Sequence, residues 1–106
     1  ESSVDIRQRV TKAREVQSAR FESFDAVNYN AQMSTKQIRE FCKLDETSLQ
    51  LLKTAMERLN LSARAYDRIL KVSRTIADLE ASTSINSTHI AEAIQYRSLD
   101  RDGWLG

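Results

Sequence analysis

The near absence of glycine and proline constrains the fold of this chain more than any other feature of its sequence. The chain has 106 residues and no proline, and its only two glycines, Gly103 and Gly106, lie at the carboxyl-terminal end. Hairpin turns favour residues that adopt positive φ at little cost, so a hairpin-rich β fold is not expected over residues 1–102. The same absence excludes glycine-rich phosphate loops, because neither GxxxxGK(S/T) nor GxGxxG occurs.

Cysteine and histidine are too scarce for the commonest metal sites. The single cysteine, Cys42, excludes an intrachain disulfide and a multi-cysteine zinc site, and the single histidine, His89, excludes a histidine cluster. We therefore expect no metal site. We interpret His89 as a neutral capping or surface imidazole and Cys42 as a small core residue, so the sequence alone does not support an independent enzyme.

The charge balance and the hydropathy of the chain limit its partners. Sixteen basic and fifteen acidic residues leave a net charge of +1, which is too balanced for a general polyanion binder, so any anion site must be local. No apolar run approaches the ~20 residues of a membrane span, and no signal peptide is visible. An unpaired cysteine fits a reducing compartment, so we expect a cytoplasmic protein without membrane contact.

Polar capping residues divide the chain into helical segments. Ser2 and Ser34 open capping boxes, Asp45 and Ser62 are expected N-caps, and apolar residues recur at helical spacing after each. The expected helices cover residues 2–24, 34–42, 45–60, 62–79 and 86–99. The prediction is an all-α bundle of four main helices plus one short helix. We expect a single domain over residues 1–101, cut from a longer protein, and a frayed tail over residues 102–106.

The helix expected over residues 62–79 carries the most informative charges. Arg64, Arg68, Lys71, Thr75 and Asp78 share one face at 100° per residue, opposite the apolar stripe. A solvated face is the alternative interpretation for Arg68 and Lys71. Arg64 differs because, with Ser62 as N-cap, it occupies the second helical position, where a cation costs about 0.3–1 kcal/mol. A phosphate brought there by a partner reverses that cost, since amide donors and a guanidinium would face one anion.

Polar residues interrupt the apolar stripe of the first expected helix. Gln17 and Arg20 lie in or beside this stripe, and Arg14 lies one turn from Gln17. One interpretation is that a loop carbonyl satisfies the glutamine and that the arginine stem packs while its head group reaches solvent. The other interpretation is that Arg14, Gln17 and Arg20 form an edge that contacts a partner domain.

Two stretches of the sequence resemble a known family. Residues 61–79 read LSARAYDRILKVSRTIADL, and residues 89–97 read HIAEAIQYR. They resemble the C-terminal domain of magnesium-chelatase-like AAA+ ATPases, a group that includes a competence-associated branch-migration helicase. Upstream, the spacing from Arg9 to Arg20 and the pair Asn30-Ala31 are similar to further family elements. The resemblance covers residues 2–101, and Ser73 is a departure, because the family pattern has alanine there.

The resemblance implies a role that composition and periodicity do not provide. The chain would be an AAA+ helical lid, and the preceding core, absent from this sequence, would carry the Walker motifs. Arg64 matches the family's sensor-2 position, so it would reach the γ-phosphate of ATP, held with Mg in the parent protein. Ser62 would cap that helix, and Arg68 is a weaker candidate for nucleotide contact.

The resemblance leaves three functions open. The first is the lid of a DNA-acting motor that works as a homo-oligomeric, hexameric ring, with its own core as the lid's first partner. The second is the lid of a metal insertase of the chelatase type. The third is a free-standing adaptor or DNA-binding bundle, against which the balanced charge argues.

Overall fold

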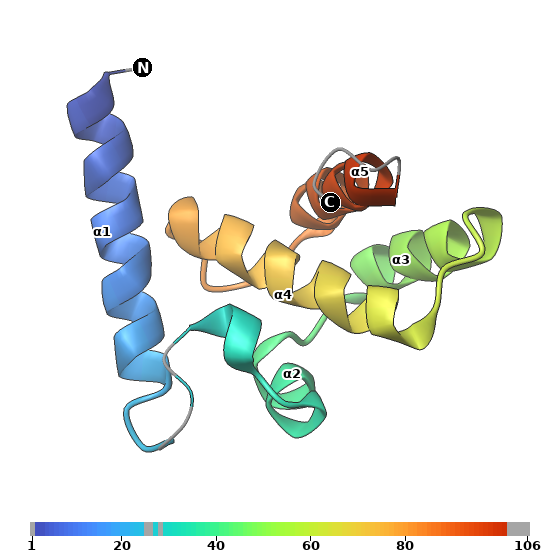
Figure 1. Cartoon of the computed structure of the whole chain (residues 1–106), viewed down its shortest axis with the longest axis horizontal. Coiled ribbons are helices and arrows are strands. Elements are labelled where there is room, and N and C mark those ends of the chain that lie inside the picture. The colour runs from blue at the N-terminus through green and yellow to red at the C-terminus, as the bar shows by residue number, and fades with distance from the viewer. Residues whose placement is uncertain (1, 25–26, 28, 102–106) are drawn as a thin grey trace.

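The computed structural model describes residues 2–24, 27 and 29–101, and this part of the chain folds as an all-α bundle, as predicted (Figure 1). Four long helices and one short helix are present in the described residues, together with one 3-10 turn, η1. The elements are α1 (Ser3–Arg20), η1 (Asn30–Gln32), α2 (Thr35–Phe41), α3 (Glu46–Arg58), α4 (Ala63–Leu79) and α5 (Ser87–Arg101). The tail predicted over residues 102–106 lies outside the described residues.

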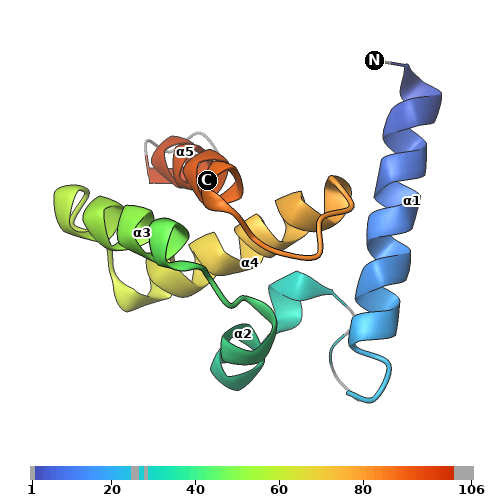
Figure 2. The same ribbon diagram turned by 180° about the vertical axis from the view of Figure 1, so that it is seen from behind.

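Helix α4 is the central element of the bundle. It contacts α1, η1, α2 and α5, and Figures 1 and 2 show it crossing the middle of the molecule from both sides. Its buried side chains include Ile69, Leu70 and Ile76, which join Leu52 of α3 and Ile90 of α5 in one core. Other elements cover α4 on several sides, which explains why apolar residues occupy a wide arc of its surface.

The predicted N-caps Ser2, Ser34, Asp45 and Ser62 are confirmed. The hydroxyl of Ser62 accepts the Ala65 amide at 3.2 Å and begins α4, and the carboxylate of Asp45 accepts the Ser48 amide at 2.7 Å and begins α3. The bond from the Ser48 amide holds the pKa of Asp45 below its usual value. Asn60 adopts a φ of 50°, the left-handed conformation expected after α3.

Helix α1 is shorter than predicted and packs over only part of its length. It ends at Arg20 rather than near Phe24, because the chain turns there and Phe21 and Phe24 pack edge-on against Phe41 of α2. Only Ala13 and Gln17 of α1 are buried, whereas the apolar Ile6 near the start of the helix is 45% exposed. The amino-terminal half of α1 extends beyond the other helices (Figures 1 and 2).

The core also encloses the thiol of Cys42, as predicted. The side chain is 4% exposed, and burial raises its pKa from 9.0 to about 11. Because the folded state holds this proton more tightly than the unfolded state, its contribution to stability is lost as the pH rises from about 9 to about 11.

We expect the folded chain to resist alkylation at Cys42. At pH 8 its thiolate fraction is about a hundredfold smaller than that of an unperturbed thiol, and the sulfur is enclosed. Iodoacetamide labelling followed by mass spectrometry checks this, with the chain in urea as the control. Equal labelling rates with and without urea would show that the thiol is open to solvent.

Candidate functional site

The amino-terminal end of α4 presents the candidate site to solvent. Helix α4 begins at Ala63, so Arg64 is its second residue, as the sequence predicts, and its side chain is exposed. Neither Arg64 nor Lys71, two turns further on, forms an ion pair with another residue in the described part of the chain. The cation at the positive end of the helix dipole is therefore available to an anion from outside.

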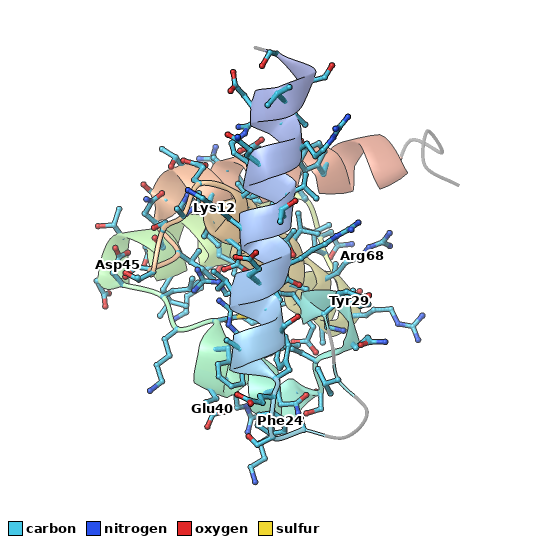
Figure 3. All side chains as sticks on the ribbon, turned by 90° about the vertical axis from the view of Figure 1, so that its left-hand side faces the viewer. Lys12, Phe24, Tyr29, Glu40, Asp45 and Arg68 are labelled. Carbon is cyan, nitrogen blue, oxygen red and sulfur yellow. The ribbon has the colours of Figure 1, made fainter. Side chains whose placement is uncertain are left out.

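A groove of about 720 Å³ runs from Arg64 along α4. Its basic edge consists of Arg64, Arg68 and Lys71, and Figure 3 shows Arg68 on the same side of α1 as Tyr29, away from Lys12 and Asp45. The groove is also lined by apolar side chains of α4 and by Tyr96 of α5. Local sequence patterns do not connect Tyr96 with the three cations, because it lies 25 residues or more from them and only the fold brings them together.

Asp78 lies on the same angular face of α4 as these cations, as the sequence predicts, but it does not share their exposure. Its side chain is buried, because α1 and η1 cover the carboxyl-terminal end of α4. The carboxylate accepts two hydrogen bonds of 2.8 Å from the guanidinium of Arg20 and one of 2.8 Å from the amide of Asn30. The guanidinium of Arg74, one turn earlier in α4, lies 3.2 Å from the same carboxylate.

The second cation of this network, Arg74, ties α4 to the loop that follows it. Its guanidinium donates to the carbonyl oxygens of Ser82 and Thr83 at 2.8 and 3.2 Å. Desolvation lowers the pKa of Arg74, and the charge of Asp78 opposes this shift. Hydrogen bonds to two carbonyls and a carboxylate thus compensate for much of the cost of burying the charge.

The partners of Gln17 and Arg20 lie inside the domain. The side-chain oxygen of Gln17 accepts the backbone amide of Asn30 at 3.0 Å, so a loop amide rather than the predicted loop carbonyl satisfies it. Arg20 uses its head group on Asp78 and on the side-chain oxygen of Asn30, at 2.8 Å, instead of extending it into solvent. Arg14 is exposed. Contact of these three residues with a partner domain stays a prediction.

His89 caps α5 from the inside of the protein. Its ring nitrogen Nδ1 accepts the Asn86 amide at 3.0 Å, and its Nε2 lies 3.3 Å from a carboxylate oxygen of Glu80. The capping role is confirmed, but the alternative of a surface imidazole is wrong, because the side chain is 1% exposed. In the described part of the chain no group of three potential metal ligands gathers.

Comparison with known proteins connects this geometry to a family. Residues 1–97 match the family described as magnesium chelatase, subunit ChlI C-terminal. The chain is 45% identical over 101 residues to competence protein ComM of Haemophilus influenzae and 43% identical over 101 residues to the uncharacterized protein YifB of Escherichia coli. It is 34% identical over 97 residues to the uncharacterized protein Rv2897c of Mycobacterium tuberculosis.

These alignments cover most of this chain but a small part of each relative. They include 95% of the chain for ComM and YifB and 92% for Rv2897c, but only 19% of the length of each of the three relatives.

No helix in the described residues is long and apolar enough to cross a membrane.

Proposed function

This chain belongs to the magnesium chelatase subunit ChlI C-terminal family, and on that premise we propose that it is the helical lid of an AAA+ ATPase. In this proposal the preceding core of the parent protein holds ATP and Mg, and the lid adds Arg64 as the sensor-2 residue. The exposed guanidinium at the second position of α4 is the observation that carries the proposal. In a lid that meets no anion, a cation at the positive end of a helix lowers the stability of the fold.

The proposed mechanism is electrostatic. Arg64 stabilises the negative charge that develops on the transferred phosphoryl group, and the amide groups at the start of α4 add to the same field. Ser62 fixes that start by accepting the Ala65 amide, so the direction of these donors is set before nucleotide binds. Arg68, one turn further along the groove, is positioned for a secondary contact with phosphate.

Helix α4 also provides a means of converting this contact into motion. It carries Arg64 near one end and Asp78 near the other, about 21 Å apart at 1.5 Å per residue. The carboxylate of Asp78 holds α1 through Arg20. A shift of α4 on loss of the γ-phosphate therefore moves α1 as well, as in other transitions of packed elements.

We propose that the parent protein is a DNA-acting motor that works as a homo-oligomeric ring. The family resemblance implies both the DNA action and the ring. The support is the similarity to a relative named as a competence protein. A metal insertase is the second candidate, and the magnesium chelatase description of the matched family favours it. ATP turnover stimulated by DNA would favour the motor, and turnover stimulated by a tetrapyrrole with Mg would favour the insertase.

A cysteine placed beside Arg64 tests whether nucleotide reaches this end of α4. In the full-length protein, we expect a non-hydrolysable ATP analogue to slow alkylation of the thiol in Ala63→Cys several-fold, because the core and its nucleotide would cover it. The buried Cys42 of the lid does not compete for the reagent. Peptide mapping by mass spectrometry measures the rate at each site.

The matched control is Gln50→Cys on the exposed side of α3, where the analogue should leave the alkylation rate unchanged. Alkylation of Ala63→Cys at one rate with and without the analogue would contradict docking of nucleotide at this helix end.

A further inference from the structure

We propose that the groove along α4 binds an amphipathic helix of a partner protein whose polar edge is acidic. The groove runs between α4 and Tyr96 of α5, with Ala31 of η1 also lining it. The inference is argued from the charged edge and the apolar side chains of the whole groove, and it is tested at Lys71 and Tyr96, which have no part in the proposed nucleotide role of Arg64.

The apolar part of the groove has the spacing of a helix-binding surface. Val72 and Leu79, both half-buried, lie at i and i+7 along α4 with the mostly buried Ile76 between them at i+4, so apolar side chains line the groove over about 10 Å. Tyr96 of α5 adds an aromatic ring to this lining and is 45% exposed. A helix of two to three turns matches this length, and its own apolar residues at the same spacing would fill the groove.

The charges at the edge of the groove determine the sign of the partner. Arg64, Arg68 and Lys71 stand along one side, and Asp67 is the one acidic residue among the described residues that line the groove. Lys71 has no ion pair with another described residue. A partner helix with glutamate or aspartate beside its apolar stripe would place opposite charges against these cations, which favours association and orientation.

The structure argues against other occupants of the groove. An extended peptide needs the free edge of a sheet for main-chain pairing, whereas helices form these walls. The exposed half of α1 in a second copy carries Arg7, Arg9, Lys12 and Arg14 against Asp5 and Glu15, so its charge would oppose docking. Single-stranded nucleic acid favours several stacked aromatic side chains, whereas Tyr96 is the one aromatic residue among the described residues that line this groove.

A synthetic helix provides a direct test. The probe is a fluorescein-labelled peptide of 18 residues with leucine at i, i+4 and i+7 and glutamate on both sides of that stripe, and the measurement is fluorescence anisotropy with the whole chain. We expect saturable binding that weakens with added salt. Lys71→Glu should weaken it about tenfold, and Tyr96→Ala about tenfold or more, since the half-buried Lys71 and the exposed Tyr96 both line the groove.

Two controls make the result specific. Lys53→Glu, on the exposed surface of α3, makes the same charge change outside the groove and should leave the affinity unchanged. A peptide with lysine in place of each glutamate should bind the unmodified chain at least about tenfold more weakly. Absence of binding, equal binding of the two peptides, or equal affinity of Lys71→Glu and the unmodified chain would overturn the proposal. Binding of a dT15 oligonucleotide in place of the acidic peptide would overturn it in favour of nucleic acid.

Discussion

Replacing Asp78 with alanine should lower the free energy of unfolding by about 3–5 kcal/mol, the usual cost of leaving buried charges without their partner. The substitution leaves the guanidinium groups of Arg20 and Arg74 facing each other with no carboxylate between them. It also removes an acceptor from Asn30. Urea denaturation followed by circular dichroism at 222 nm measures the change.

The expected loss is large for a chain of this size. Domains have a total stability of about 5–15 kcal/mol, so Asp78→Ala leaves the folded state marginal. The matched control is Asp67→Ala on the same helix, a half-exposed carboxylate whose loss should cost under about 1 kcal/mol. An Asp78→Ala chain as stable as the Asp67→Ala chain would show that the network contributes nothing to the fold.

The network around Asp78 shows what helical periodicity alone could not indicate. Helical periodicity places Asp78 on the same angular face as Arg64, and at the amino-terminal end of that face Arg64 and Arg68 are exposed. The carboxyl-terminal half is buried because α1 and η1 cross it. Periodicity describes one helix at a time, so it cannot indicate where another element covers a polar face.

Asn30 shows a second limit of sequence reasoning. Asparagine is typical of turns, and Asn30 lies in the segment between the helices expected over residues 2–24 and 34–42. The structure instead buries Asn30 completely, in a 3-10 turn, where it bonds to Gln17, Arg20, Thr75 and Asp78. Contacts over 10 to 48 residues of sequence separation leave no local pattern.

The N-caps could be predicted because their contacts are local in the sequence. The bonds at Ser2, Ser34, Asp45 and Ser62 join residues three positions apart, so the pattern and the contact lie in one short segment. The position of Arg64 depends only on such a cap, which is why the candidate site could be located from sequence while its groove could not. The groove needs Tyr96, which only the packing of α5 on α4 supplies.

Replacing Arg64 with alanine should have opposite effects on stability and on activity. The isolated domain should become slightly more stable, because the substitution removes a cation from the positive end of α4, where it costs about 0.3–1 kcal/mol. In the full-length protein, ATP turnover should fall by about a hundredfold or more, the loss typical of removing one group that stabilises transition-state charge. Loss of a residue with a merely structural role would not raise the stability of the domain while lowering ATP turnover.

The control for this substitution is another arginine at a helix end. Arg58 lies in the last turn of α3, where a cation is favourable, and it is exposed. Arg58→Ala should leave ATP turnover unchanged and should not stabilise the domain. Arg64→Lys should retain part of the turnover, since a lysine keeps the charge without the planar guanidinium.

The most direct test of the account is therefore steady-state ATP turnover of the full-length protein with Arg64→Ala beside Arg58→Ala. The account predicts that the first substitution depresses turnover by about two orders of magnitude, with a fully folded lid, and that the second leaves it at the level of the unmodified protein. Equal turnover in all three proteins would contradict the proposal that α4 delivers its exposed arginine to the nucleotide.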